Sequence, residues 1–194
     1  MRQILLASLT ITTSCGPECM DWPEQIPPPA LWTMPLILRA DLNSSPMAKA
    51  AFMEAAWRWQ FVGMKFEIVT DPRPEEERPQ YGEPKIVGFR GPEDFCINWN
   101  KGGYAQTDWI PVGDKYWYYG YAALCVEILE RDHRDYLAWV GIAQHELGHA
   151  IGFPHFENSL MSDATNDCPL GFTKEDGEYM PSQIAVRGKI ANIQ

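Results

Sequence analysis

Apolar residues recur at intervals of three and four between Pro46 and Gly63, which places them on one face of a helix. Ser44 or Ser45 can cap the start of this helix, and Pro46 suits its first position because no hydrogen-bond partner is available there for a backbone N–H. Gly63 is a residue type that commonly ends helices. The pattern therefore predicts a helix from Pro46 to about Val62.

A second helix is predicted from about Tyr136 to Ile151. Asp132 or Asp135 lies near its start, where a carboxylate interacts favourably with the helix dipole. Gly152 and Pro154 follow and interrupt the helical pattern.

The other apolar runs are short and predict strands. They cover residues 31–39, 64–69, 86–89, 95–99 and 122–129. Residues 122–129 fit a strand better than a helix, whereas the Pro-rich and acidic segment 71–85 is typical of a solvated loop. The order strand, helix, several strands, helix predicts an α+β domain with helices packed on one sheet.

The composition supports one folded domain in a chain of 194 residues. The apolar share of 45% is enough for a packed core, and the net charge of −10 disfavours a nucleic-acid backbone or an anionic membrane surface as the main partner. We therefore expect no nucleic-acid partner.

The first residues resemble a secretory signal peptide, which we place at 1–14. Arg2 precedes a short apolar run, and small residues lead to Cys15. The run is shorter than the roughly 20 apolar residues that span a bilayer, so no membrane span is expected. An alternative is that it forms the buried first strand of the domain. Residues 15–30 are expected to be a Pro-rich linker, followed by the domain at 31–194, and the chain is expected to be secreted or extracytoplasmic.

The cysteines leave several arrangements open. Cys15 follows a small residue, as in the lipid-attachment site of bacterial lipoproteins, although Thr12 stands where such sites usually carry Leu. A lipid anchor at Cys15 would leave four cysteines, enough for two disulfides in an oxidising compartment. These four are Cys19, Cys96, Cys125 and Cys168. Free buried thiols at Cys96 and Cys125 are the alternative, and the sequence does not determine the pairing.

The second helix carries a candidate zinc site. His145 and His149 are four positions apart, so both rings can reach one point from one helix face. Gly152 can adopt positive φ, and the resulting turn can bring His155 round as a third ligand. Three protein ligands leave a fourth position for water, as in catalytic zinc sites, and Glu146 projects beside the metal. Histidines of purely structural role are the alternative, but three of the four His in the chain fall in this one pattern.

Residues 145–155 match the H-E-x-x-H-x-x-G-x-x-H motif of the metzincin zinc peptidases, and Met161 resembles the methionine of their Met-turn. The resemblance to small, matrixin-like members implies a small twisted sheet, an active-site helix and a short C-terminal subdomain ending in a helix. Thr173 is the expected cap of that helix. The resemblance also implies that an extended substrate pairs with an edge strand, expected near residues 103–107.

The resemblance implies a zinc metalloendopeptidase with one catalytic ion, held by His145, His149 and His155. Glu146 would be the general base that takes a proton from a zinc-bound water, while Gly152 and Met161 shape the site. The substrate would be a polypeptide. A zinc-containing binding module without turnover and a small-substrate zinc hydrolase are the alternatives. Structural calcium occurs in some relatives, but no calcium-loop pattern supports it in this sequence.

Overall fold

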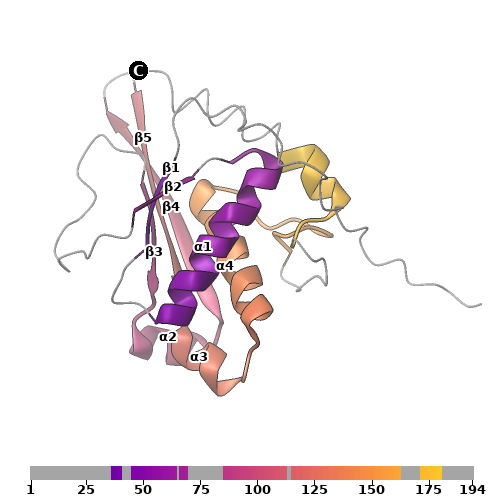
Figure 1. Cartoon of the computed structure of the whole chain (residues 1–194). Helices are drawn as coiled ribbons and strands as arrows, with labels where there is room; N and C mark the ends of the chain where they lie inside the picture. The colour runs from indigo at the N-terminus through magenta and orange to yellow at the C-terminus, as the bar shows by residue number, and fades with distance from the viewer. Residues whose placement is uncertain are drawn as a thin grey trace, which may run out of the picture.

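A five-stranded sheet forms the centre of the fold, in the order β2-β1-β3-β5-β4 (Figure 1). The strands are β1 (Leu36–Ala40), β2 (Phe66–Val69), β3 (Lys85–Arg90), β4 (Gly103–Val112) and β5 (Lys115–Leu124). Neighbouring strands are parallel except β4, which pairs antiparallel with β5 at the edge of the sheet. The chain is therefore an α+β protein, as the order of predicted elements indicates.

The computed structural model describes residues 36–40, 45–64, 66–69, 85–112, 115–162 and 171–180. The predicted signal peptide at 1–14 and the linker at 15–30 lie outside these residues, as do Cys15, Cys19 and Cys168. None of the helices within the described residues is long and apolar enough to cross a membrane.

Two long helices cover one face of the sheet and pack side by side (Figure 1). They are α1 (Pro46–Trp59), which is extended by a 3-10 turn (Gln60–Val62), and α4 (Tyr136–Ile151). The short helices α2 (Glu93–Trp99) and α3 (Val126–Arg131) lie together at one end of the sheet, and residues 174–180 form a last helical segment.

The main core lies between the two long helices and the sheet. Trp59 of α1 is fully buried and stacks on Phe153, with ring centroids 5.7 Å apart. The Trp59 and Phe172 rings are nearly perpendicular, with centroids 5.2 Å apart. The Trp59 indole N–H donates to the Gln144 carbonyl over 2.9 Å. A single side chain thus connects α1, α4 and the C-terminal segment.

The predicted ends of the long helices are confirmed. Ser45, one of two candidate caps, accepts a hydrogen bond from the Ala48 backbone N–H, and Pro46 is the first helical residue. Gly63 adopts a φ of 99° after the 3-10 turn. Asp135 caps α4 through the Ala138 N–H over 2.8 Å.

One strand prediction is wrong, and a second, 122–129, is correct only for residues 122–124. Residues 95–99 belong to helix α2, in which Phe95 and Trp99 are one turn apart and stack at 5.2 Å. Glu93 and Asp94 lie in the first turn of this helix, where acidic residues interact favourably with the helix dipole. The run 122–129 divides at Cys125, where β5 has ended and α3 begins.

Cys96 and Cys125 form a disulfide with a Cα–Cα distance of 5.3 Å, and both residues are buried. The bond joins α2 to the residue that precedes α3. The Cys125 backbone N–H also donates to the Gly102 carbonyl over 2.9 Å. Gly102 directly precedes strand β4, so the disulfide stabilises the start of the edge strand.

Candidate metal centre

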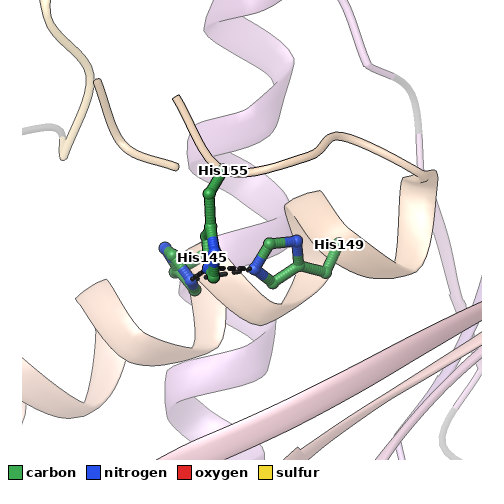
Figure 2. A group of neighbouring side chains, drawn as sticks. All are labelled: His145, His149 and His155. Carbon is green, nitrogen blue, oxygen red and sulfur yellow. Dashed lines mark hydrogen bonds between the residues drawn. The ribbon is translucent and has the colours of Figure 1, made fainter. Parts of the chain in front are cut away.

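Three histidine rings converge at the C-terminal end of α4 (Figure 2). The Nε2 atoms of His145 and His149 are 3.0 Å apart, those of His149 and His155 are 2.8 Å apart, and those of His155 and His145 are 3.3 Å apart. His145 and His149 are partly buried, whereas His155 is exposed. The sequence prediction that these three residues meet is confirmed, and they lie close enough to hold a metal ion.

Backbone carbonyls determine which nitrogen carries the proton in two of the rings. His145 Nδ1 lies 2.9 Å from the Leu160 oxygen, and His149 Nδ1 lies 2.8 Å from the Phe153 oxygen. A carbonyl oxygen can only accept, so each Nδ1 must donate. In a neutral imidazole this leaves a lone pair on Nε2. These two lone pairs therefore face one another across the centre, an arrangement that a cation stabilises.

The spacing of the three nitrogens suits a small divalent ion. Nitrogen ligands at roughly 2.0–2.1 Å from zinc in tetrahedral geometry are separated from one another by about 3.3 Å. One observed Nε2 separation, 3.3 Å, equals this value, and the other two, 3.0 and 2.8 Å, are shorter. Imidazole nitrogens are ligands that suit zinc and several other divalent transition metals. Within the described residues, no other group of three His, Cys, Asp or Glu side chains comes together in this way.

Gly152 makes the turn that brings His155 back to the helix. It ends α4 with a φ of 95°, a left-handed conformation that side chains rarely adopt. Its N–H donates to the His149 carbonyl over 2.7 Å, and the next N–H, of Phe153, donates to Gly148 over 2.9 Å. The predicted role of Gly152 as the turning residue is confirmed.

Glu146 is buried on α4 and lies against the edge strand. A Cβ built on Gly103 would fall 2.8 Å from Glu146 Cγ, so the first residue of β4 contacts this side chain closely. Burial raises the pKa of Glu146 to about 8, and the positive charge of Lys101 acts in the opposite direction. A metal ion held by the histidines would add a positive charge near Glu146 and favour the carboxylate, which is the form that can accept a proton.

Met161 is fully buried and packs against the backbone of Gly148. It therefore supports α4 at a residue that lies between His145 and His149 in the sequence. His133, by contrast, is exposed and adopts a φ of 50° at the end of the α3 segment, outside the cluster.

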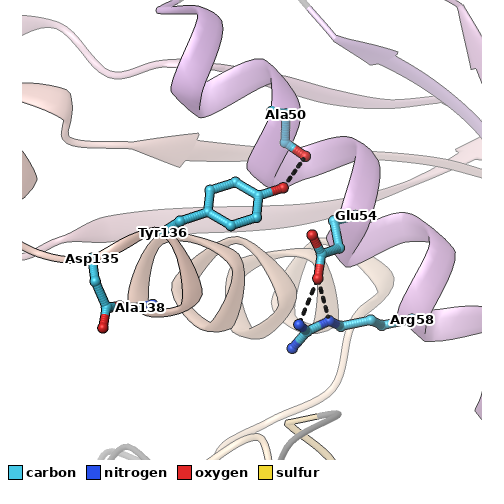
Figure 3. Close-up of polar contacts among 6 residues, drawn as sticks. All are labelled: Ala50, Glu54, Arg58, Asp135, Tyr136 and Ala138. Carbon is cyan, nitrogen blue, oxygen red and sulfur yellow. Dashed lines mark hydrogen bonds and ion pairs between the residues drawn. The ribbon is translucent and has the colours of Figure 1, made fainter.

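The other end of α4 is attached to α1 (Figure 3). The Tyr136 hydroxyl donates to the Ala50 carbonyl over 3.4 Å, beside the ion pair of Glu54 and Arg58 at 2.6 Å. Burial, followed by the neighbouring Glu54 carboxylate, raises the pKa of Tyr136 to about 12. With Asp135 as the cap, these contacts fix the helix that carries two of the three histidines.

Thr173 caps the C-terminal helical segment, as predicted. Its hydroxyl oxygen accepts from the Asp176 N–H over 3.1 Å, while Asp176 Oδ2 accepts from the Thr173 N–H over 2.8 Å. This reciprocal pair is a capping box. Ser159 and Asp176 both hold the backbone around Leu160, and neither is predicted from the sequence as a site residue. For Asp176, the three-residue spacing from Thr173 is the available signal.

No model of a known protein family matches the chain, and a search of curated proteins finds no match either.

Proposed function

We propose that the protein is a zinc-dependent endopeptidase of the metzincin type. The observation that carries the proposal is the convergence of the Nε2 atoms of His145, His149 and His155, with Glu146 buried on the same helix. Three nitrogen ligands leave a fourth coordination position, which distinguishes a catalytic zinc site from a closed structural one.

When bound, zinc supplies Lewis acidity, which lowers the pKa of coordinated water to about 7 and polarises a substrate carbonyl. Glu146 then accepts the proton from the attacking water and passes it to the leaving amine. The Nδ1–H groups of His145 and His149 stay on the Leu160 and Phe153 carbonyls, which holds both rings in one tautomer.

Strand β4 provides the surface on which an extended polypeptide can be bound. It lies at the edge of the sheet and begins at Gly103, in contact with Glu146. A peptide added beside β4 by backbone hydrogen bonds would place a carbonyl group near the general base. This geometry favours a polypeptide over a small substrate.

The metzincin assignment is supported by the motif at 145–155, by the left-handed Gly152 and by the buried Met161. The disulfide between Cys96 and Cys125 supports export of the chain, because such bonds persist in oxidising compartments.

The proposal is tested with the full purified chain incubated with an unfolded polypeptide, with and without a chelator, alongside measurement of bound zinc. We expect chelator-sensitive cleavage by the wild type. Glu146→Gln should retain zinc and lose cleavage by about 10²- to 10⁴-fold, since the general base is removed. Glu130→Gln, at an exposed position, is the matched control and should cleave normally.

The other outcomes separate the alternatives. Bound zinc without any cleavage would favour a binding module, and turnover of small esters alone would favour a small-substrate hydrolase. Full cleavage by Glu146→Gln would contradict the assignment of the base.

A further inference from the structure

The backbone carbonyls that orient His145 and His149 come from different parts of the chain. The Phe153 carbonyl that bonds His149 belongs to the turn that directly follows α4, and the Phe153 N–H is itself bonded to Gly148 over 2.9 Å. The Leu160 carbonyl that bonds His145 comes from a segment fifteen residues further along the chain. Contacts outside α4 must therefore hold the Leu160 backbone in place.

Two side chains hold the backbone on both sides of Leu160. Ser159 Oγ accepts from the Met161 N–H over 2.9 Å. This N–H and the Leu160 C=O belong to one planar peptide unit and point in opposite directions, so fixing the N–H aims the carbonyl at His145. On the other side, Asp176 Oδ2 accepts from the Leu160 N–H over 2.8 Å. We call Ser159 Oγ and Asp176 Oδ2 the Leu160 clamp.

Both members of the clamp are themselves fixed and fully buried. The Ser159 hydroxyl donates to the Phe156 carbonyl over 2.8 Å, so its oxygen is oriented toward Met161. Asp176 Oδ2 also accepts from the Thr173 N–H over 2.8 Å and from the Thr173 hydroxyl over 3.1 Å. The capping box of the C-terminal helical segment is thus joined to the metal centre through one carboxylate oxygen.

We propose that Ser159 and Asp176 are positioning residues for the metal centre, which fix His145 through the Leu160 carbonyl and make zinc affinity depend on the C-terminal segment. The inference rests on the proposed zinc site. Groups that orient a metal-binding histidine through its second ring nitrogen affect metal affinity by about 10- to 100-fold. The Leu160 clamp lies one hydrogen bond further from the metal, because it orients the carbonyl that bonds His145.

The test measures the zinc dissociation constant of the full chain by competition with a chelator, and the visible absorption spectrum of the cobalt-substituted protein. Ser159→Ala and Asp176→Ala should each raise the dissociation constant about 10-fold, the lower end of this range, and change the cobalt spectrum, which reports ligand geometry. Asp176→Asn should stay close to wild type, because its amide oxygen can accept the same hydrogen bonds.

Glu178→Gly is the matched control. It weakens the helical segment 174–180 at an exposed position, because glycine disfavours helix, but leaves Ser159, Thr173 and Asp176 with their hydrogen bonds. It should lower the thermal midpoint without changing the zinc dissociation constant or the cobalt spectrum. If Asp176→Ala does not fold, Ser159→Ala carries the test, since it removes a single oxygen atom.

Folded Ser159→Ala and Asp176→Ala proteins with wild-type zinc affinity and cobalt spectrum would overturn the role of the clamp. An equal loss of affinity in Glu178→Gly would also overturn it, because helix stability alone would then explain the effect. A wild-type chain that binds no zinc would instead overturn the proposed function, on which the clamp depends.

Discussion

The sulfur of Met161 lies so close to the backbone of Gly148 that a Cβ at Gly148 would overlap it. The same Cβ would fall 3.0 Å from Cζ2 of Trp59. Both Met161 and Trp59 are fully buried, so neither can move aside freely. Gly148 therefore allows the Met161 side chain to support α4 directly between His145 and His149.

We predict that Gly148→Ala destabilises the protein by about 1–3 kcal/mol, the usual effect of overpacking a filled core. It should also weaken zinc binding, because α4 or Met161 must shift. Gly141→Ala is the control on the same helix, since a Cβ there meets nothing within 4 Å. Alanine is favoured over glycine in helices, so Gly141→Ala should stabilise the protein by about 0.5–1 kcal/mol. Denaturant unfolding checks both, and a stabilised Gly148→Ala protein would contradict the predicted contact.

Gly103 should be required for the position of Glu146, the proposed general base. A Cβ at this position would lie 2.8 Å from Glu146 Cγ and 2.9 Å from the Ala123 carbonyl oxygen. We expect Gly103→Ala to lower kcat by about 10- to 100-fold through displacement of Glu146, with zinc content unchanged.

Gly102→Ala is the matched control for this substitution. Its Cβ would meet the ends of the Ile142 and Leu129 side chains at 2.8 and 3.0 Å, and those can move without disturbing Glu146. Peptide cleavage and bound zinc are measured on both variants. Equal kcat values for the two would show that contact with Glu146 is unimportant.

The meeting of the three histidines was easier to predict from the sequence than the elements around them. His145, His149, Gly152 and His155 lie within one short segment, so local helix geometry and one glycine turn determine their arrangement. The contacts that orient His145 depend on Asp176, whose approach to Leu160 is set by tertiary packing and leaves no periodic signal.

The wrong strand prediction has a similar cause. Residues 95–99 are apolar and short, which fits a strand or a helix equally by pattern. The disulfide of Cys96 with Cys125 and the stacking of Phe95 on Trp99 form in the helix. Pairing of distant cysteines cannot be deduced from sequence, so the element it stabilises was missed.

Removal of the metal should lower thermal stability. A ligand that binds only the folded state stabilises it by about 2.7 kcal/mol at a free concentration of 100 times its dissociation constant. For a chain of this size that corresponds to a shift of roughly 5–10 °C. Calorimetry with zinc and with chelator should show the shift in the wild type and not in His149→Ala. His133→Asn, at an exposed position whose φ of 50° asparagine tolerates, should show the same shift as the wild type.

Loss of the disulfide should lower the thermal midpoint of the fold and leave zinc affinity nearly unchanged. The two cysteines are separated by 29 residues, and closing a loop of that length contributes about 3–4 kcal/mol by the chain-entropy estimate. A double variant, Cys96→Ser with Cys125→Ser, should lower Tm by roughly 10 °C. Zinc affinity should change little, because neither cysteine contacts the histidine cluster. An unchanged Tm would show that the bond does not form in the folded protein.

The stability of the wild type should fall, relative to Asp176→Asn, as the pH rises. Burial raises the pKa of Asp176 above its ordinary value, and the donors at Oδ2 offset this only in part. An acid with a raised folded-state pKa binds its proton more tightly when folded. Its contribution to stability is therefore fully present below the unfolded-state pKa of about 3.9 and is lost as the pH rises through the folded-state pKa.

Asn cannot ionise and so avoids this loss while accepting the same hydrogen bonds. Urea unfolding with chelator present, from about pH 4 to about pH 8, should show the free energy of unfolding of Asp176→Asn rising relative to wild type. Asp94→Asn, at an exposed position, controls for the change in net charge. A difference that is constant with pH would show that the three donors at Oδ2 balance the desolvation of this carboxylate. A change in the opposite direction would show that the donors outweigh it.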